Sequence, residues 1–319
     1  MAGDVLVTIG EALIDFIPSE KGCDFDKVGS FIPAIGGAPA NVCAAYAKLG
    51  GKARMLTKLG NDPFGSKIVK ELGDIGIDTS HIIRTDDANT ALAFVSLSED
   101  GNRTFAFYRN PSADMLYRYD EMDSGAFEDV FALHFCSVSL GDFPMKDAHY
   151  RAIEEAREQG ALISFDPNLR FMLWNDRDKL WNVVNEFLPN ADILKISDDE
   201  LEFILGTDNI DEVLPVLWEE GIKLVLYTLG AEGMKAYTPG CTVAVKSEAT
   251  DVVDTTGAGD MSIGALLKKL CEMGINRENI GSITEDQLRS CLEFSSKCCA
   301  YSVSIKGAIP SFPAASDLK

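Results

Sequence analysis

Short apolar runs alternate with amphipathic segments along most of the chain. Residues 4–10 are rich in β-branched side chains and end in glycine, which predicts a buried strand. Residues 38–51 are alanine-rich, carry Pro39 near the first turn and stop at two glycines, which predicts a helix. The same reasoning predicts strands at 53–60, 130–138, 161–166, 192–197 and 223–230, and helices at 62–77, 147–160, 178–188, 198–206 and 210–221. This order predicts an α/β fold of three layers, with a mainly parallel central sheet covered on both faces.

Two stretches interrupt the alternation. Residues 25–37 and 90–108 lack helical periodicity, and the second reads as two alternating strands around a turn at Glu99–Asn102. A small antiparallel lid on the α/β body is the simplest interpretation. No low-complexity linker or solenoid repeat occurs, so we expect a single domain over residues 1–319. Its β lid is expected to come from about 15–35 and 88–112.

The amino-acid composition excludes several classes of binding partner for this protein. The 319 residues include 29 lysines and arginines against 50 acids, a net charge of −21. A field of this sign repels nucleic acid and anionic membrane surfaces, so we expect neither as a partner. It would also repel ATP, so a nucleotide site must have local positive potential. Eight cysteines show no CxxC pair, and three histidines form no HExxH, which makes a histidine-rich metal centre improbable. Without a signal peptide or an apolar run long enough for a bilayer, we expect a cytoplasmic protein.

The stretch "DTTGAGD", residues 254–260, is the first candidate for chemistry. It has no GK[ST] ending and fails GxGxxG, so neither a Walker A loop nor a Rossmann turn is indicated. The apolar stripe after it predicts a helix, which places Gly257, Ala258 and Gly259 at a helix N-terminus. Unpaired N–H groups and the helix dipole favour an anion there. A tight helix entry with no ligand explains the same residues equally well.

Asp260 follows this candidate anion site directly. An acid in the first turn often only stabilises the helix. Phosphoryl transfer to an alcohol, however, needs donors for the phosphoryl oxygens and an acceptor for the hydroxyl proton, and this loop offers both. We expect the helix end to depress the pKa of Asp260, so that the proton moves late, when bonding to phosphorus acidifies the hydroxyl.

At this point the sequence resembles the ribokinase/fructokinase (PfkB-type) family of sugar kinases. "GGAPANV" (36–42) resembles the family's sugar-side signature, and "DTTGAGD" its C-terminal one. "GEALIDFIP" (10–18), "DGNRTFAFYRNPSAD" (100–114) and "DPNLR" (166–170) resemble the fructokinases most closely. The resemblance covers almost the whole chain and implies a ribokinase-like three-layer body with a β lid.

The resemblance also implies roles for individual residues. Asp260 would be the general base, and Gly257, Ala258 and Gly259 the anion hole for the transferred phosphoryl group. The sugar would be bound by Asp15, Gly37, Asn41, Arg103 and Arg170. Without the resemblance, Asp15 is better explained as a helix or turn cap and Asn41 as a capping or turn contact, and surface arginines are usually only solvated.

On the nucleotide side, the resemblance implies ATP and Mg²⁺. Glu200 would organise hydrated magnesium, although Ser197 stands where the family has asparagine. The ATP-site residues would be Lys195, Glu200, Thr228, Gly230 and Gly233. A monovalent cation such as K⁺ would be held beside the anion hole by Asp254, Thr256, Ser302, Gly307 and Ser311. Met261-Ser262 also departs from the family, which has a small residue followed by an aromatic that packs behind the loop.

These features predict an ATP-dependent kinase that phosphorylates the 6-hydroxyl of D-fructose. The alternative is another sugar kinase of this fold, chiefly one for 2-keto-3-deoxygluconate, whose carboxylate Arg103 or Arg170 could bind. A non-catalytic sugar sensor is a further alternative, although a sensor has no need of Asp260. A two-stranded flap is marginal alone, so we also expect a homodimer paired through the lid.

Overall fold

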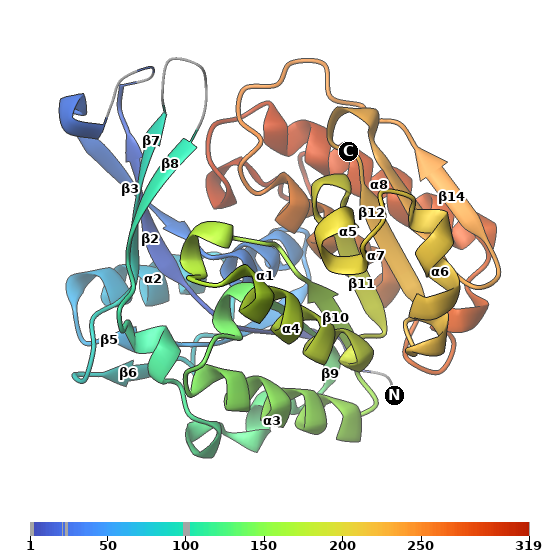
Figure 1. Ribbon diagram of the computed structural model, residues 1–319, viewed down its shortest axis with the longest axis horizontal. Helices are drawn as coiled ribbons and strands as arrows, with labels where there is room; N and C mark the ends of the chain where they lie inside the picture. The colour runs from blue at the N-terminus through green and yellow to red at the C-terminus, as the bar shows by residue number, and fades with distance from the viewer. Residues whose placement is uncertain (1–2, 21, 23–24, 98–102, 319) are drawn as a thin grey trace.

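The computed structural model describes residues 3–20, 22, 25–97 and 103–318, and for residues 96, 97 and 103–105 it describes the backbone alone. Within these residues an eight-stranded sheet runs through the body in the order β14-β13-β12-β11-β10-β9-β1-β4 (Figure 1). All strand pairs from β12 to β4 are parallel, while β13 and β14 pair antiparallel at one edge. The strands are β1 (Val5–Ile9), β4 (Lys52–Leu56), β9 (Val130–Cys136), β10 (Leu162–Asp166), β11 (Ile193–Ser197), β12 (Leu224–Thr228), β13 (Met234–Tyr237) and β14 (Thr242–Val245).

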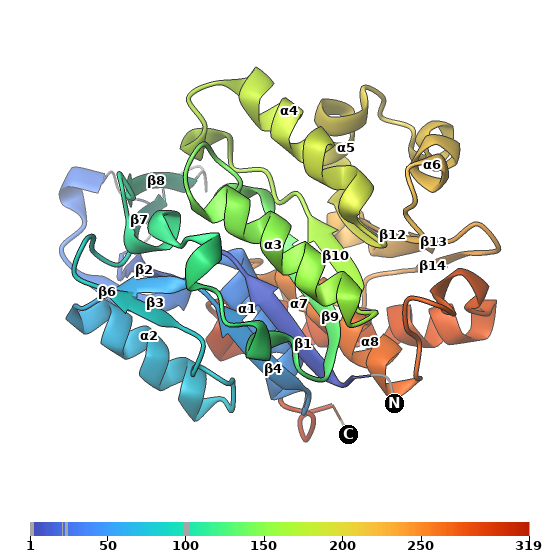
Figure 2. The same cartoon turned by 90° about the horizontal axis from the view of Figure 1, so that it is seen from below.

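Helices cover both faces of this sheet, as the alternation of elements predicted (Figure 2). Alternate strand residues point to opposite faces. On β1, Leu6 packs into one core, which includes α1 (Ala38–Lys48), α7 (Ala258–Glu272) and α8 (Glu285–Val303). Val5 and Val7 pack into the other core. That second core includes α3 (Met145–Glu158), α4 (Arg177–Phe187), α5 (Asp198–Leu205) and α6 (Ile210–Glu219). The three-layer α/β fold is therefore confirmed.

A second sheet stands out from the body and forms the lid (Figure 1). Its order is β3-β2-β7-β8, built from β2 (Leu13–Pro18), β3 (Phe31–Gly36), β7 (Leu92–Leu97) and β8 (Arg103–Tyr108). Both hairpins are antiparallel, and β2 pairs parallel with β7 between them. The predicted hairpin is thus present, while its turn at Glu99–Asn102 lies outside the described residues.

One predicted strand is wrong. Residues 53–60 divide into β4, in the main sheet, and β5 (Lys58–Gly60), because β5 pairs with β6 (Ile83–Thr85) in a separate two-stranded sheet. The helix α2 (Pro63–Asp74) follows, with Asp62 capping its N-terminus through the Gly65 amide. No helix in the described part of the chain combines the length and the apolar character that crossing a bilayer requires.

Candidate active site

A pocket of about 630 Å³ lies between the lid and the carboxyl ends of the parallel strands. Ligand sites of open α/β sheets occur at this edge, because the loops that leave the strands converge there. The lid contributes Leu13, Asp15 and Phe107 to the pocket wall. The predicted site residues that line it are Asp15, Gly37, Asn41, Arg170, Lys195, Glu200, Thr228, Gly230, Gly233, Thr256, Gly257, Ala258, Gly259 and Asp260. Arg103 begins β8, but its side chain lies outside the described part of the structure.

The loop 254–260 enters α7 as predicted. Gly257 is the N-cap residue with φ +78°, a left-handed conformation that glycine adopts without strain. The first N–H groups of a helix have no partner within the helix. Here the Ala258 amide donates to the Thr255 carbonyl at 3.2 Å, and residues 257–260 line the pocket. Asp260 lies in this turn and is buried, with 8% of its surface exposed. Its Oδ2 accepts a hydrogen bond of 2.8 Å from Nδ2 of Asn41 on α1.

The expected depression of the Asp260 pKa is wrong. Burial raises the pKa of Asp260, and this effect outweighs the hydrogen bond from Asn41 and the positive charges of Arg170 and Lys195, which lower it. The helix end stabilises the charged form of Asp260, but the carboxylate has lost most of its water. This desolvation destabilises the charged form by more than the helix end stabilises it. Asp260 is consequently a stronger base than an exposed aspartate would be.

Asp15 and Arg170, which are predicted to bind the sugar, both line the pocket. Asp15 lies on β2, and burial raises its pKa to about 7, with Arg170 opposing the shift and Asp260 adding to it. Arg170 follows the end of β10 and remains exposed, with its Nη1 donating to the Leu169 carbonyl at 3.0 Å. Two carboxylates and one guanidinium therefore share this end of the pocket.

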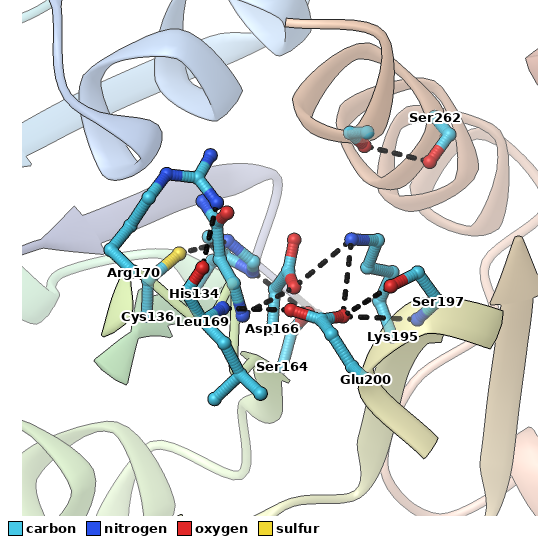
Figure 3. Close-up of polar contacts among 12 residues, drawn as sticks. His134, Cys136, Ser164, Asp166, Leu169, Arg170, Lys195, Ser197, Glu200 and Ser262 are labelled. Atoms are coloured by element: carbon cyan, nitrogen blue, oxygen red, sulfur yellow. Dashed lines mark hydrogen bonds and ion pairs between the residues drawn. The ribbon is translucent and has the colours of Figure 1, made fainter. Parts of the chain in front are cut away.

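A buried ion-pair network contains Lys195 and Glu200, two of the residues predicted for the nucleotide site (Figure 3). Lys195 Nζ on β11 donates to Oδ1 of Asp166 at 3.1 Å and lies 4.0 Å from Oε2 of Glu200. Glu200 accepts from the Leu169 amide at 2.7 Å, and from the amide and hydroxyl of Ser197 at 3.0 and 2.9 Å. Glu200 thereby joins the ends of β10 and β11.

The pKa values in this network follow from burial and pairing. Burial raises the pKa of Asp166 to about 7 despite the opposing charge of Lys195. Burial alone would lower the pKa of Lys195, but Asp166 and Glu200 raise it well above its ordinary value. Lys195 also lies close to the anion site, since a Cβ on Gly259 would be 3.3 Å from its Nζ. A fixed positive charge therefore lines the pocket of this acidic chain, in agreement with the local positive potential that the sequence predicts for a nucleotide site.

Comparison with known proteins identifies the family of this chain. Residues 4–315 match the pfkB family carbohydrate kinases, and Fructokinase-1 of Oryza sativa subsp. japonica is 42% identical over 316 residues, covering 98% of this chain and 96% of the relative. The chain belongs to the pfkB family of carbohydrate kinases.

Solved structures agree with this family. The fructokinase of Xylella fastidiosa with bound ATP superposes with a TM-score of 0.89 at 32% identity, covering 99% of this chain and 97% of that one. The fructokinase of Vibrio cholerae O395 with bound fructose, ADP and calcium has a TM-score of 0.86 at 32% identity, with full coverage of both chains. A double mutant of the latter contains fructose, ADP and potassium. The ribokinase-like body and lid of this pfkB-family chain match these neighbours.

The predicted monovalent-cation residues of this pfkB-family kinase lie together behind the anion site. The Asp254 carboxylate accepts from the Thr256 amide at 3.0 Å and its hydroxyl at 2.6 Å, and from the Gly307 amide at 2.9 Å. Ser302 and Ser311 share a hydrogen bond of 2.8 Å. Of the five residues only Thr256 lines the pocket. The loop before α7 is thus tied to the segment after α8.

The two departures of this kinase from the family pattern have local explanations. Ser197 supplies its amide and hydroxyl to Glu200 in place of the asparagine. Met261 is fully buried in the core, where it fills space behind the loop. Ser262 donates to the Gly259 carbonyl at 2.7 Å and so braces the anion-site turn (Figure 3).

Two buried acids of the pocket region were not predicted as site residues. Asp166 lies inside the quoted "DPNLR" and Glu11 inside "GEALID", and they are 0% and 2% exposed. Each ends or follows an apolar strand, which is also the position of an ordinary turn acid. A carboxylate at the carboxyl end of a parallel strand is the one signal that could have identified them.

Proposed function

We propose that this kinase transfers the γ-phosphoryl group of ATP to the 6-hydroxyl of D-fructose, giving fructose 6-phosphate and ADP. The arrangement that carries the proposal is Asp260, buried at the N-terminus of α7 and oriented by Asn41, in one pocket with Asp15 and Arg170. A relative and two solved neighbours are named fructokinases, one with ATP and one with fructose and ADP. Both the geometry and the relatives support fructose as the acceptor.

In this mechanism one set of residues binds the sugar, and another set stabilises the charge of the phosphoryl group. Asp15 and Arg170 would hold sugar hydroxyls together with the Asn41 side-chain oxygen, which is buried and has no partner in the described structure. Asp260 accepts the proton of the 6-hydroxyl, and its raised pKa favours that transfer. The N–H groups at 257–259 and Lys195 would stabilise the negative charge that develops on the phosphoryl oxygens.

Magnesium and a monovalent cation are part of the proposal. Asp166 Oδ2 is buried without a partner in the described structure, which is the kind of oxygen that hydrated Mg²⁺ needs, and Glu200 lies beside it. The hydroxyl and backbone oxygens around Asp254 and Ser302 are of the type that suits K⁺. When bound, these ions neutralise phosphate charge and stiffen the loop.

Replacing K⁺ by Na⁺ at constant ionic strength should lower the turnover rate, and an unchanged rate would count against the monovalent site.

A panel of sugars in an ATP-coupled assay tests the substrate. We expect turnover with D-fructose and ³¹P chemical shifts that match phosphorylation at the 6-position. The alternative substrate, 2-keto-3-deoxygluconate, requires a cation for its carboxylate, and Arg170 could serve. Turnover of that sugar acid in the absence of turnover with fructose would overturn the proposal. Binding of fructose with no phosphorylation at all would instead indicate a sugar sensor. A cytoplasmic location, where ATP is available, fits this activity and stays a prediction.

We also propose a homodimer paired through the lid. Aromatic rings gather on the lid sheet, where Phe16 and Phe94 stack at 4.5 Å and Phe94 contacts Phe31 and Tyr108. Ile32 and Tyr108 are 56% and 65% exposed, so a single chain leaves apolar lid surface in water. Sedimentation equilibrium at micromolar concentration should give twice the 34.6 kDa chain mass, and a monomer mass would contradict the pairing.

Fructose binding should weaken as the pH falls below 7. Asp15 has a pKa of about 7 in the free pocket, so protonation competes with the hydroxyl donors of the sugar. For a group that binds only when ionised, affinity falls about tenfold for each pH unit below its pKa. Isothermal titration of fructose without ATP, from pH 5.5 to 8.5, measures this slope. Asp15→Asn should bind weakly at pH 8 and lose most of the slope. A wild-type affinity independent of pH would refute the role of Asp15.

A further inference from the structure

Three chain crossings between lid and body meet at one point beside the sugar end of the pocket. Glu11 lies in the link from β1 to β2, Gly37 in the link from β3 to α1, and Arg109 directly after β8. The lid strands leave the body at this end (Figure 1). A fourth link, residues 86–91, joins β6 to β7, so movement of the lid relative to the body involves the contacts among these three links and that segment.

Buried polar side chains connect the three crossings. Glu11 Oε1 accepts from the Ala38 amide at 3.3 Å, at the start of α1, and its Oε2 accepts from the Ser139 hydroxyl at 2.6 Å. Arg109 Nη2 donates to the same hydroxyl at 3.3 Å, and Arg109 Nη1 donates to the Val138 carbonyl at 3.1 Å. Asp114 accepts from Arg109 Nε at 2.9 Å. Ser139 is thus both the donor to Glu11 and the acceptor from Arg109.

The connected groups are almost completely withdrawn from water. Ser139 is 0% exposed, Glu11 2% and Asp114 1%, and the Arg109 side chain is 6% exposed. Polar groups buried to this extent hold their geometry strongly, because a broken contact leaves a desolvated charge without a partner. The backbone is equally constrained, since Gly37 has φ +100° and a Cβ there would lie 2.4 Å from the Glu11 carbonyl oxygen. The junction therefore has little freedom to adopt other conformations.

Both sides of the sugar site depend on this junction. The Glu11 link continues into β2, which carries Asp15, while the Ala38 amide begins α1, which carries Asn41 and through it orients Asp260. Glu11 lines the pocket, but both of its carboxylate oxygens already accept protein hydrogen bonds. Its role is therefore to hold other residues in place.

We propose that Glu11, Ser139, Arg109 and Asp114 form the joint that sets the position of the lid relative to the body, which makes Glu11 and Ser139 positioning residues for sugar binding. The inference rests on the proposed sugar-kinase function for its kinetic readout. The nucleotide side lies on β11, β12 and the start of α7, and none of the four joint residues belongs to these elements. Damage to the joint should therefore affect the sugar and spare ATP.

Ser139→Ala and Glu11→Gln test the joint, each in the full-length enzyme. Ser139→Ala removes the shared hydroxyl, and Glu11→Gln keeps an oxygen for Ala38 but loses the charge. We expect each to raise the sugar KM about tenfold with the ATP KM unchanged, because each removes the short hydrogen bond between Ser139 and the charged Glu11. The double variant should be no worse than the worse single one, since both remove the same interaction. Equal increases in both KM values, or additive effects, would overturn the proposal.

Ser295→Ala is the matched control. Ser295 is an equally buried serine on α8, away from the joint, so its variant should keep both KM values. Hydrogen exchange supplies a readout that needs no turnover: Ser139→Ala should speed exchange of the β2 and β3 amides while leaving α6 amides as in the wild type. Wild-type exchange in the lid would refute the joint. If the wild-type enzyme does not phosphorylate fructose, the substrate proposal fails, while the exchange result still decides the joint.

Discussion

Asp260→Asn is expected to retain fructose binding and to lose phosphorylation by about two to four orders of magnitude, the usual contribution of a positioned general base. Asparagine fits the same space and can still accept from Asn41 Nδ2 through its side-chain oxygen. Its amide cannot take the proton of the 6-hydroxyl at any accessible pH. The loss should therefore appear in kcat, with the fructose dissociation constant changed far less.

The stability of Asp260→Asn separates this loss from misfolding. Burial raises the pKa of Asp260, so the ionised carboxylate destabilises the folded state at neutral pH. Removing that charge should leave the melting temperature unchanged or higher, as is common when a functional residue is neutralised. Asp286→Asn, which changes an exposed acid in the first turn of α8, should keep full activity. Wild-type kcat in Asp260→Asn would exclude Asp260 as the base.

Lys195→Met should destabilise the protein strongly and abolish turnover. Methionine matches the length of the lysine stem but leaves Asp166 and Glu200 without their buried cation. Removing one partner of a buried ion pair typically lowers the free energy of unfolding by about 3–5 kcal/mol. The anion site beside Gly259 also loses its fixed positive charge, so ATP binding should weaken. Urea unfolding and titration with ATP measure the two effects separately.

The stability deficit of Lys195→Met should grow with pH. Without the ammonium group, the folded-state pKa of Asp166 rises further above its unfolded value, and Glu200 loses one of the charges that lower its pKa. At Asp166 the folded variant then binds more protons than the unfolded chain between about pH 4 and the raised pKa, so its free energy of unfolding falls as the pH increases through that window. We therefore expect a larger deficit at pH 8 than at pH 5. Lys70→Met, at an exposed pair with Asp74 on α2, should unfold at the wild-type midpoint at both pH values. A deficit independent of pH would show that lost packing, and not the unpaired carboxylates, destabilises Lys195→Met.

Local pattern was sufficient for most elements of this fold. Residues 4–10 and 38–51 formed the predicted strand and helix, because β-branched runs and alanine-rich segments with clear ends specify them within a few residues. The helix after "DTTGAGD" was equally local, and with it the position of Gly257, Ala258 and Gly259 at the helix N-terminus. The strand predicted at 53–60 was wrong because the chain changes sheets at Thr57, and only the pairing of β5 with β6 shows this.

Contacts between distant segments decided the properties of the site. Asn41 and Asp260 are 219 positions apart, and their contact orients the carboxylate, while the burial around it raises a pKa that the helix end alone was expected to lower. Glu11 and Asp166 read as ordinary turn acids until the fold encloses them with Ser139 and Lys195. The sequence by itself therefore determined the layers, the anion-site turn and the type of chemistry. Only the tertiary structure decided which carboxylates are desolvated, which are paired and how the lid is joined to the body, because burial and charge pairing depend on neighbours that the linear pattern does not reveal.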